Sequence, residues 1–331
     1  MWILVWLGCV ASPDPVDVGH RLDDVLTFAD VVALGTHNSF HVKTDELTLK
    51  EWDYDHLPLD QQLGGLGVRQ FELDVWFNVA HGRFEVFHIP VVDEATTCRW
   101  LSECLATMAI WSASFPAHHP LFTLLEMKDA AGEDVDGRLA ALEAEVEAAF
   151  GDALIRPSEV QREEDSLVAG LAANGWPTLG ELRGRALFVM HDTGAWRDAY
   201  VASGTATLAL FPDAGNDVAA PWAAVHTMND PVADASVIAE AVALGHLVRT
   251  RADTDGEEAR INDLGPAGAA LTSGAHFVST DFPAPHPDTG YVVKIQGGTP
   301  SACNLAYAPI DCRSEDIEDP EILSATASLL R

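Results

Sequence analysis

Short apolar runs alternate along the chain with longer segments of helical periodicity. The apolar runs predict β-strands at residues 31–35, 68–75, 121–127, 186–190, 247–250, 276–280 and 291–295. Most of these runs are continuously apolar, which is typical of a parallel sheet that is covered on both faces. Helices are predicted between them, at residues 138–150, 177–182 and 232–244.

This alternation of strands and helices favours an α/β fold. It extends over most of the chain without an internal repeat and without a linker rich in Pro, Gly or Ser. We therefore predict a single TIM-type (β/α)8 barrel over residues 21–331, and a doubly wound open sheet is the alternative. No glycine-rich phosphate loop follows a predicted strand, so the sequence does not support nucleotide binding.

The charge balance excludes one class of partner. The 331 residues include 51 Asp and Glu against 19 Lys and Arg, which gives a formal net charge of -32. Because clustered Lys and Arg hold a phosphate backbone, we do not expect a nucleic-acid binder. With 48 % hydrophobic residues the chain can bury a large core, so the acidity indicates a folded protein with a strongly negative surface.

The beginning of the chain predicts export. Residues 1–10 form a short apolar run, and residues 11–15 are small, polar and turn-prone. Leu7-Gly8-Cys9 resembles a bacterial lipobox, in which Cys9 would carry the lipid. We predict an export or lipoprotein signal with a short linker at residues 1–20; a mis-assigned start codon that truncates a longer signal is the alternative. No run reaches the roughly 20 apolar residues that a membrane-spanning helix needs.

The remaining cysteines agree with export. Cys98 lies six positions before Cys104, and Cys303 and Cys312 bound a loop near the end of the chain. Two local pairs are what an oxidising compartment favours, and neither has the two-residue spacing of a zinc knuckle. We expect both pairs to form disulfides, with four unrelated buried thiols as the alternative.

Polar residues interrupt the apolar pattern at the ends of predicted strands, where active groups collect in parallel α/β folds. Residues two apart on a strand point to the same face of the sheet. Acidic side chains at such positions on neighbouring strands would therefore lie close together. The interrupting residues are His37 and Asn38 after the first strand, Glu72 and Asp74 in the second, His88 after a short strand at residues 84–87, and Glu126 with Lys128 in the segment at 121–128.

Three carboxylates in otherwise apolar strands would be costly to bury without partners. A divalent cation between Glu72, Asp74 and Glu126 removes that cost. With the amide oxygen of Asn38 they form an all-oxygen set, which suits Ca²⁺ or Mg²⁺ rather than zinc. A solvated glutamate or a structural histidine is the ordinary interpretation of each residue alone, but the combination favours a metal site.

These segments resemble the active site of the calcium-dependent phosphoinositide-specific phospholipases C. The resemblance rests on His37-Asn38, Glu72-x-Asp74, His88 and Glu126. Segments at residues 182–189, 229–231, 245–253 and 273–283 resemble the compact bacterial branch, so the similarity covers roughly residues 25–315. It implies a TIM-type barrel, one catalytic Ca²⁺ rather than Mg²⁺, and cleavage of phosphatidylinositol to diacylglycerol and an inositol phosphate through a 1,2-cyclic intermediate.

The resemblance also implies roles for individual residues. The calcium ligands would be Asn38, Glu72, Asp74 and Glu126. Glu72 or Glu126 would accept the proton of the inositol 2-hydroxyl. One of the two histidines, as an imidazolium, would stabilise the five-coordinate phosphorus, and the other would protonate the diacylglycerol oxygen as it leaves. We favour His37 for the first role and His88 for the second, and the reverse assignment stays open on the sequence.

Basic residues near these strands are expected to meet the substrate. Lys128 would point into the same cleft and hold the phosphate or a headgroup oxygen. Arg249 and Arg251 alternate on one predicted strand. They would bind the substrate, or else form ion pairs with Asp253 or Asp281.

The expected partner is a phospholipid at a membrane surface. Val189 and Met190 stand where the eukaryotic relatives carry paired lysines for the 4- and 5-phosphates, so plain phosphatidylinositol is the expected substrate. Apolar residues near the strand ends would touch the bilayer; the candidates are Trp76, Phe77, Ile89, Val91, Val92, Phe211 and Trp222.

Two other functions stay open on the sequence. Glycerophosphodiester phosphodiesterases use a similar barrel, a Glu-x-Asp pair and two histidines, but they normally carry His-Arg-Gly where this chain has His37-Asn38-Ser39. A surface lipoprotein whose barrel only binds a ligand is the second alternative, and the intact set of histidines and carboxylates argues against it.

Overall fold

The computed structural model describes residues 19–44, 49–132, 134–202, 204–297, 300–319, 321 and 323. Cys9 and residues 1–18 of the predicted export segment lie outside this range, so lipidation and the export signal stay predictions. Within the described part of the chain, no helix is long and apolar enough to cross a membrane.

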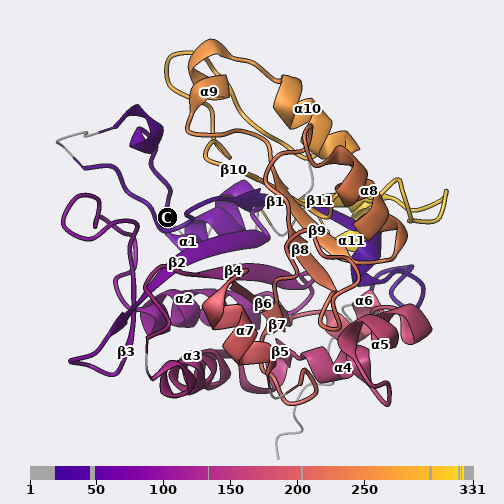
Figure 1. The fold of residues 1–331 in the computed structure, drawn as a ribbon. Helices are drawn as coiled ribbons and strands as arrows, with labels where there is room; N and C mark the ends of the chain where they lie inside the picture. The colour runs from indigo at the N-terminus through magenta and orange to yellow at the C-terminus, as the bar shows by residue number, and fades with distance from the viewer. Residues whose placement is uncertain are drawn as a thin grey trace, which may run out of the picture.

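Eight parallel strands lie at the centre of the molecule (Figure 1). They are β1 (Val31–Thr36), β2 (Gln70–Asn78), β4 (Leu121–Met127), β6 (Ala186–His191), β7 (Phe211–Pro212), β8 (Val225–Thr227), β9 (Leu247–Arg251) and β10 (Phe277–Thr280). They pair in the order β7-β6-β4-β2-β1-β10-β9-β8, and a bridge between Asp213 and Val225 joins the two ends. The strands therefore form the predicted TIM-type barrel, with few backbone contacts where β7 meets β8.

Further strands lie outside the ring. β3 (Arg83–Val86) forms an antiparallel hairpin with β2, β11 (Ser301–Cys303) pairs antiparallel with β1, and β5 (Leu154–Ile155) lies beside β6. The strand predicted at residues 291–295 is wrong, because this segment joins no ladder. Tyr291, Val293 and Ile295 are nevertheless buried. The alternation therefore reflects packing of an extended loop on the core and not strand pairing.

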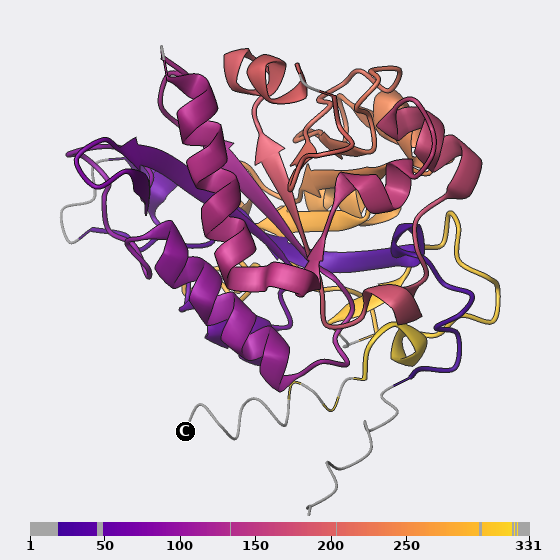
Figure 2. The same ribbon diagram turned by 90° about the horizontal axis from the view of Figure 1, so that it is seen from below.

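Helices surround the barrel and fill the connections between its strands (Figures 1 and 2). They are α1 (Leu59–Gln61), α2 (Leu101–Ser114), α3 (Val135–Phe150), α4 (Pro157–Gln161), α5 (Leu167–Asn174), α6 (Leu179–Leu182), α7 (Ala195–Val201), α8 (Ala235–Ala243), α9 (Glu257–Ile261), α10 (Gly265–Thr272) and α11 (Ser314–Ile317). The three predicted helices correspond to α3, α6 and α8.

Helix α3 illustrates why the sequence folds as it does locally. Leu139, Leu142, Val146 and Phe150 are buried and recur every three or four residues, so they form one apolar stripe. The helix ends at Gly151, whose positive φ of 49° favours glycine. Helices α2 and α3 lie side by side against the β2-β3 hairpin (Figure 2).

Alternate residues of the barrel strands point to opposite sides of the sheet. The rings of Phe122 on β4 and Phe277 on β10 stack with centroids 4.2 Å apart, although these strands are not neighbours. This contact therefore passes through the barrel interior. The opposite set, which includes Phe71 and Phe188, belongs to the layer between the sheet and the helices.

Both predicted disulfides are present. Cys98 is bonded to Cys104 in the first turn of α2. Cys303, the last residue of β11, is bonded to Cys312 in the loop that follows. Two disulfides fit an extracellular protein, since such bonds persist in oxidising compartments.

Candidate metal centre and active site

The inward-facing positions change from apolar to polar toward the carboxyl end of each strand. On β4, Leu124 precedes Glu126. On β6, Val189 precedes His191. The other inward-facing polar groups are Glu72 and Asp74 on β2, Arg249 and Arg251 on β9, and Asp281 directly after β10. Parallel strands bring all of these groups to one end of the barrel.

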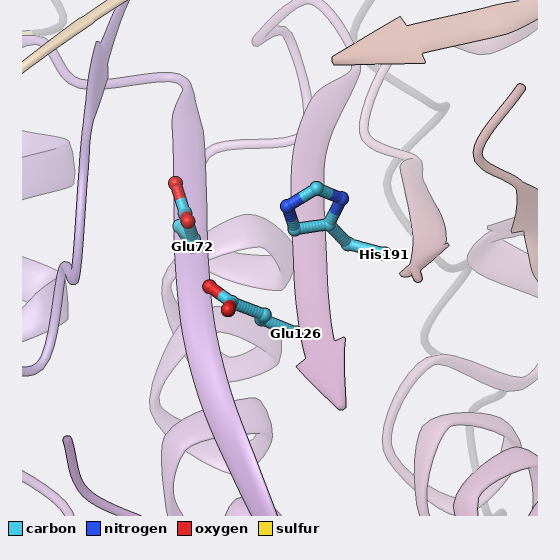
Figure 3. A group of neighbouring side chains, drawn as sticks. All are labelled: Glu72, Glu126 and His191. Atoms are coloured by element: carbon cyan, nitrogen blue, oxygen red, sulfur yellow. The ribbon is translucent and has the colours of Figure 1, made fainter. Parts of the chain in front are cut away.

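Acidic side chains form the centre of this end. One ligand atom each from Glu72, Glu126 and His191 lie within 4.8 Å of one another (Figure 3). Asp74 is opposite Glu126 in the β2–β4 register and is fully buried. The Lys128 ammonium contacts both carboxylates, 3.2 Å from Asp74 Oδ2 and 3.0 Å from Glu126 Oε1. Lys128 therefore neutralises part of the acidic charge.

Burial and mutual repulsion set the protonation of this centre. Burial raises the pKa of Asp74, and the nearby charge of Glu126 raises it further. Burial opposes the charge of Lys128, but the Asp74 and Glu126 carboxylates outweigh that effect and raise its pKa. Burial also opposes charge on His191; its hydrogen bond to Asp213 and the surrounding carboxylates nevertheless raise its pKa to about 9.

Two buried groups here lack hydrogen-bond donors among the described residues. Asn38 is 2 % exposed, and its Oδ1 has no partner while its Nδ2 donates to the Tyr54 hydroxyl at 3.3 Å. Neither Asp74 oxygen accepts a well-formed hydrogen bond, and Oδ2 has only its contact with Lys128. Orphaned buried acceptors are costly, and a cation would satisfy them. The predicted ligands therefore fit a hard divalent cation.

A buried arginine reaches this centre from the far side of the barrel. Arg249 Nη2 donates to Glu72 Oε2, and its Nη1 donates to Asn229 Oδ1. Arg249 is fully buried, and β1 and β10 lie between β9 and β2 in the ring, so this contact crosses the interior. The expected partners of Arg249 were Asp253, Asp281 or the substrate, and the structure pairs it with Glu72 instead. A direct substrate role for Arg249 stays a prediction.

His37 belongs to a second cluster at the mouth. Its Nδ1 donates to Asp281 Oδ1 at 2.8 Å, and its Nε2 lies 3.4 Å from Arg251 Nη1. Arg251 also donates to Asp281 Oδ2 at 3.2 Å, which confirms one of the two expected ion pairs. Burial lowers the pKa of His37 well below its ordinary value, and the charge of Arg251 lowers it further. Both effects favour the neutral imidazole of His37.

His88 is held by a different carboxylate. Its Nδ1 donates to Asp93 Oδ2 at 2.8 Å, and the same oxygen accepts from His41 Nε2 at 3.0 Å. Burial opposes charge on Asp93, but the two imidazole hydrogen bonds outweigh it and lower the pKa of Asp93 to about 2. His41 is fully buried and its Nδ1 donates to the Tyr54 carbonyl. His41 is thus a structural residue that fixes Asp93.

The sequence interpretation missed His191 and the carboxylates that orient the three histidines. It examined Val189 and Met190, but the next inward-facing residue on that strand is His191. Extending the period of two by one step would have found it. Asp93, Asp213 and Asp281 carry no comparable signal, because their roles depend on partners elsewhere in the fold.

Only some of the apolar residues predicted to touch the bilayer are exposed. Val91 is 94 % exposed and Val92 is 44 % exposed. The prediction for Phe211 is wrong: it is fully buried, because β7 points its side chain into the barrel against Trp176. The rings of Trp76 and Phe87 stack in parallel with their centroids 5.4 Å apart. Trp76 is partly buried, as are Phe77, Ile89 and Trp222.

Comparison with known proteins identifies one family. The family model for Ca²⁺-dependent phosphoinositide phospholipase C matches residues 78–305, which include His88 and Glu126 but not His37 or Glu72. No curated protein sequence matches the chain.

Solved structures resemble the whole barrel. A calcium-dependent phosphoinositol-specific phospholipase C from a Gram-negative bacterium, Pseudomonas sp, solved with myoinositol, is 19 % identical with a TM-score of 0.63, covering 86 % of this chain and 98 % of that one. A Ca²⁺-dependent phosphatidylinositol-specific phospholipase C from Streptomyces antibioticus is 18 % identical with a TM-score of 0.59, covering 78 % and 95 %. These similarities establish the fold.

Proposed function

Because the chain belongs to the family of Ca²⁺-dependent phosphoinositide phospholipases C and is a phosphodiesterase, we propose that it cleaves phosphatidylinositol to diacylglycerol and an inositol phosphate, with one bound Ca²⁺. The observation that carries this proposal is the buried oxygen set. Within the described residues, neither the Asp74 carboxylate nor Asn38 Oδ1 accepts a well-formed hydrogen bond, and Asp74 has only its ion pair with Lys128. Glu72 lies two residues before Asp74 on β2, and Glu126 lies opposite Asp74 on β4. Two histidines held by carboxylates belong to the same end of the barrel.

The residues that would hold the ion are Asn38, Glu72, Asp74 and Glu126. When bound, Ca²⁺ neutralises the phosphodiester and lowers the pKa of the inositol 2-hydroxyl. Lys128 supplies part of the compensating charge in the metal-free protein through its contacts with Asp74 and Glu126. Once a cation neutralises these carboxylates, we expect the Lys128 ammonium to bind a phosphate oxygen of the substrate.

Glu126 is the better candidate for the general base. Its side chain is 30 % exposed, whereas that of Glu72 is 3 % exposed and accepts from Arg249. A base must reach the proton that it takes, and an accessible carboxylate at the mouth can do so. Glu72, whose Oε2 accepts from Arg249, would then act only as a ligand of the metal ion.

His37 and Arg251 act together on the phosphorus. The sequence assigned the stabilising charge to the His37 imidazolium, but burial and Arg251 lower the pKa of His37. In this proposal Arg251 carries the positive charge toward the phosphorane oxygens. Asp281 holds both side chains, so the imidazole and the guanidinium keep one fixed arrangement.

His88 is the proposed general acid. Asp93 accepts a hydrogen bond from Nδ1 at 2.8 Å, which leaves Nε2 free to give its proton to the diacylglycerol oxygen. The His88 side chain is 16 % exposed and Trp52 lies edge-on to its ring with centroids 5.5 Å apart. A partly covered imidazole at the mouth suits a leaving group that stays in the lipid phase.

Plain phosphatidylinositol is the proposed substrate. The 331-residue sequence contains only four lysines, Lys43, Lys50, Lys128 and Lys294. Lys128 directly follows β4 and contacts Asp74 and Glu126 of the acidic centre. Additional phosphates on the inositol ring would need further cationic partners. The Pseudomonas sp structure was solved with myoinositol, which supports the same headgroup class here.

The turn after His88 is the proposed contact with the membrane. Ile89 and Asp93 exchange backbone hydrogen bonds of 2.9 Å, and Val91 stands at the tip of the turn with 94 % exposure. Val91 has a φ of 69°, which is strained for a β-branched residue. An exposed apolar side chain on a strained turn gains nothing in water, but it would gain by entering a lipid interface.

Phosphorus NMR of the products tests the proposal. Phosphatidylinositol vesicles are incubated with the protein in Ca²⁺ or in excess chelator, and His88→Gln is the matched control. We expect an inositol phosphate signal, formed through a cyclic phosphodiester, with Ca²⁺ only, and little product from the variant. Undiminished turnover in chelator would refute the calcium mechanism. Release of glycerol 3-phosphate from glycerophosphoinositol, with none from the intact lipid, would assign the chain to a glycerophosphodiesterase activity.

A further inference from the structure

One imidazole at the acidic centre has no part in the reaction proposed above. His191 ends β6, and its Cα is in register with that of Glu126 on β4. One ring nitrogen faces Glu72 and Glu126 (Figure 3). We propose that His191 Nε2 is a ligand of the divalent cation that this centre binds, beside Glu72 and Glu126. This inference rests on the proposed function only in taking the metal centre as real.

The ring of His191 is oriented for this task. Its Nδ1 lies 2.6 Å from Asp213 Oδ2 and donates to it, which directs Nε2 to the acidic centre. Asp213 is fully buried, and its Oδ1 accepts from the backbone amides of Gly215 at 2.9 Å and Thr227 at 3.1 Å. A carboxylate that fixes the outer nitrogen of an imidazole is the usual support of a metal-bound histidine.

The neighbouring cations leave room for a metal ion. Arg249 occupies Oε2 of Glu72, and Lys128 contacts Oε1 of Glu126. Among the described residues, no ion pair engages the second oxygen of either carboxylate, so a cation could bind these two oxygens together with His191 Nε2.

A nitrogen ligand changes which ions the centre prefers. Carboxylate and amide oxygens alone suit Ca²⁺ and Mg²⁺, whereas an imidazole favours first-row transition metals. With His191 in the set we expect Mn²⁺ to bind in competition with Ca²⁺. Loss of the imidazole should weaken Mn²⁺ binding more than Ca²⁺ binding.

Pulsed electron paramagnetic resonance of the Mn²⁺-loaded full-length protein tests the ligand directly. We expect ¹⁴N modulation of the Mn²⁺ echo in the wild type, its replacement by the ¹⁵N pattern after labelling with ¹⁵N-histidine, and its loss in His191→Gln. The matched control is His37→Gln, which should keep the ¹⁴N modulation. Asp213→Asn should weaken Mn²⁺ binding about tenfold, because loss of the residue that orients a metal-bound histidine usually lowers metal affinity by at least this much.

The outcomes separate this inference from the proposed function. Mn²⁺ that binds and is displaced by Ca²⁺ but shows no histidine nitrogen would overturn the role of His191 and leave the calcium centre standing. Nitrogen modulation that survives in His191→Gln would do the same. A wild-type protein that binds neither ion by calorimetry would overturn both. The ¹⁵N-labelled wild type needs no substitution, so the test holds even if a variant fails to fold.

Discussion

Asp93 Oδ2 lies 2.8 Å from Nδ1 of His88 and accepts a hydrogen bond from it. The same oxygen accepts from the buried His41 at 3.0 Å, so the carboxylate is fixed from two sides. Asp93 is 2 % exposed and closes the turn that begins at Ile89. The geometry indicates a positioning residue that acts through His88.

Replacement of Asp93 should therefore affect the leaving-group step. We expect Asp93→Asn to lower kcat on phosphatidylinositol by roughly 10²-fold, the lower end of general acid contributions. A phosphodiester with a phenolate leaving group needs no proton from His88, so Asp93→Asn should lose little on that substrate. Equal losses on both substrates, or a collapse of the thermal transition, would mean that Asp93 is merely structural.

His37 should be neutral at physiological pH in the metal-free protein. Burial and the nearby Arg251 charge both disfavour the imidazolium, so its pKa is lowered. NMR titration of the His37 ring should show a neutral imidazole throughout the range in which exposed histidines lose their proton. Arg251→Gln should raise the pKa of His37, since it removes the nearby charge that lowers this pKa most. A His37 that titrates with the exposed histidines in the wild type would contradict the proposed division of charge.

Replacement of Val91 by glycine should stabilise the fold and weaken membrane binding. Val91→Gly relieves the left-handed strain at φ 69° and should raise the unfolding free energy by up to about 1 kcal/mol. The same change removes an exposed apolar group from the mouth, so it should weaken co-sedimentation with phosphatidylinositol vesicles. Turnover of a soluble substrate should stay unchanged. Ile110→Ala, on the exposed face of α2, is the control and should leave vesicle binding unaltered.

The opposite end of the barrel should show a separate acid sensitivity. Arg69 donates through Nε to Glu318 Oε2 at 2.9 Å, and both side chains are buried. Burial alone would raise the pKa of Glu318, but the charge and hydrogen bonds of Arg69 outweigh it and lower that pKa from 4.5 to about 2. The stabilisation is thus complete above pH 4.5 and is lost as the pH falls toward 2, about 3 kcal/mol in all.

Urea unfolding at about pH 5 and about pH 2.5 measures this contribution. The double variant Arg69→Met with Glu318→Leu replaces the pair by apolar groups, which avoids leaving one buried charge alone. We expect its unfolding free energy to fall by less than that of the wild type over this range, with most of the roughly 3 kcal/mol as the difference. Parallel decreases in the two proteins would show that Glu318 titrates near its ordinary pKa when folded.

The sequence by itself determined the features that depend on neighbouring positions. A period of two put Glu72 and Asp74 on one face of β2, and continuous apolar runs predicted the longer parallel strands. Local spacing was also enough to pair Cys98 with Cys104. The short strands β7 and β8 were missed, since two or three residues carry no periodicity.

Only the tertiary structure decided how these groups are paired. Glu72 meets Arg249 across 177 positions, and His37 meets Asp281 across 244. His191 meets Asp213 because β6 pairs with β7. Closure of the barrel brings the carboxyl ends of all its strands to one mouth, and the choice of counter-charge there follows from three-dimensional proximity and burial. No local pattern encodes that choice, which is why the sequence located the acidic centre but not the residues that orient its histidines.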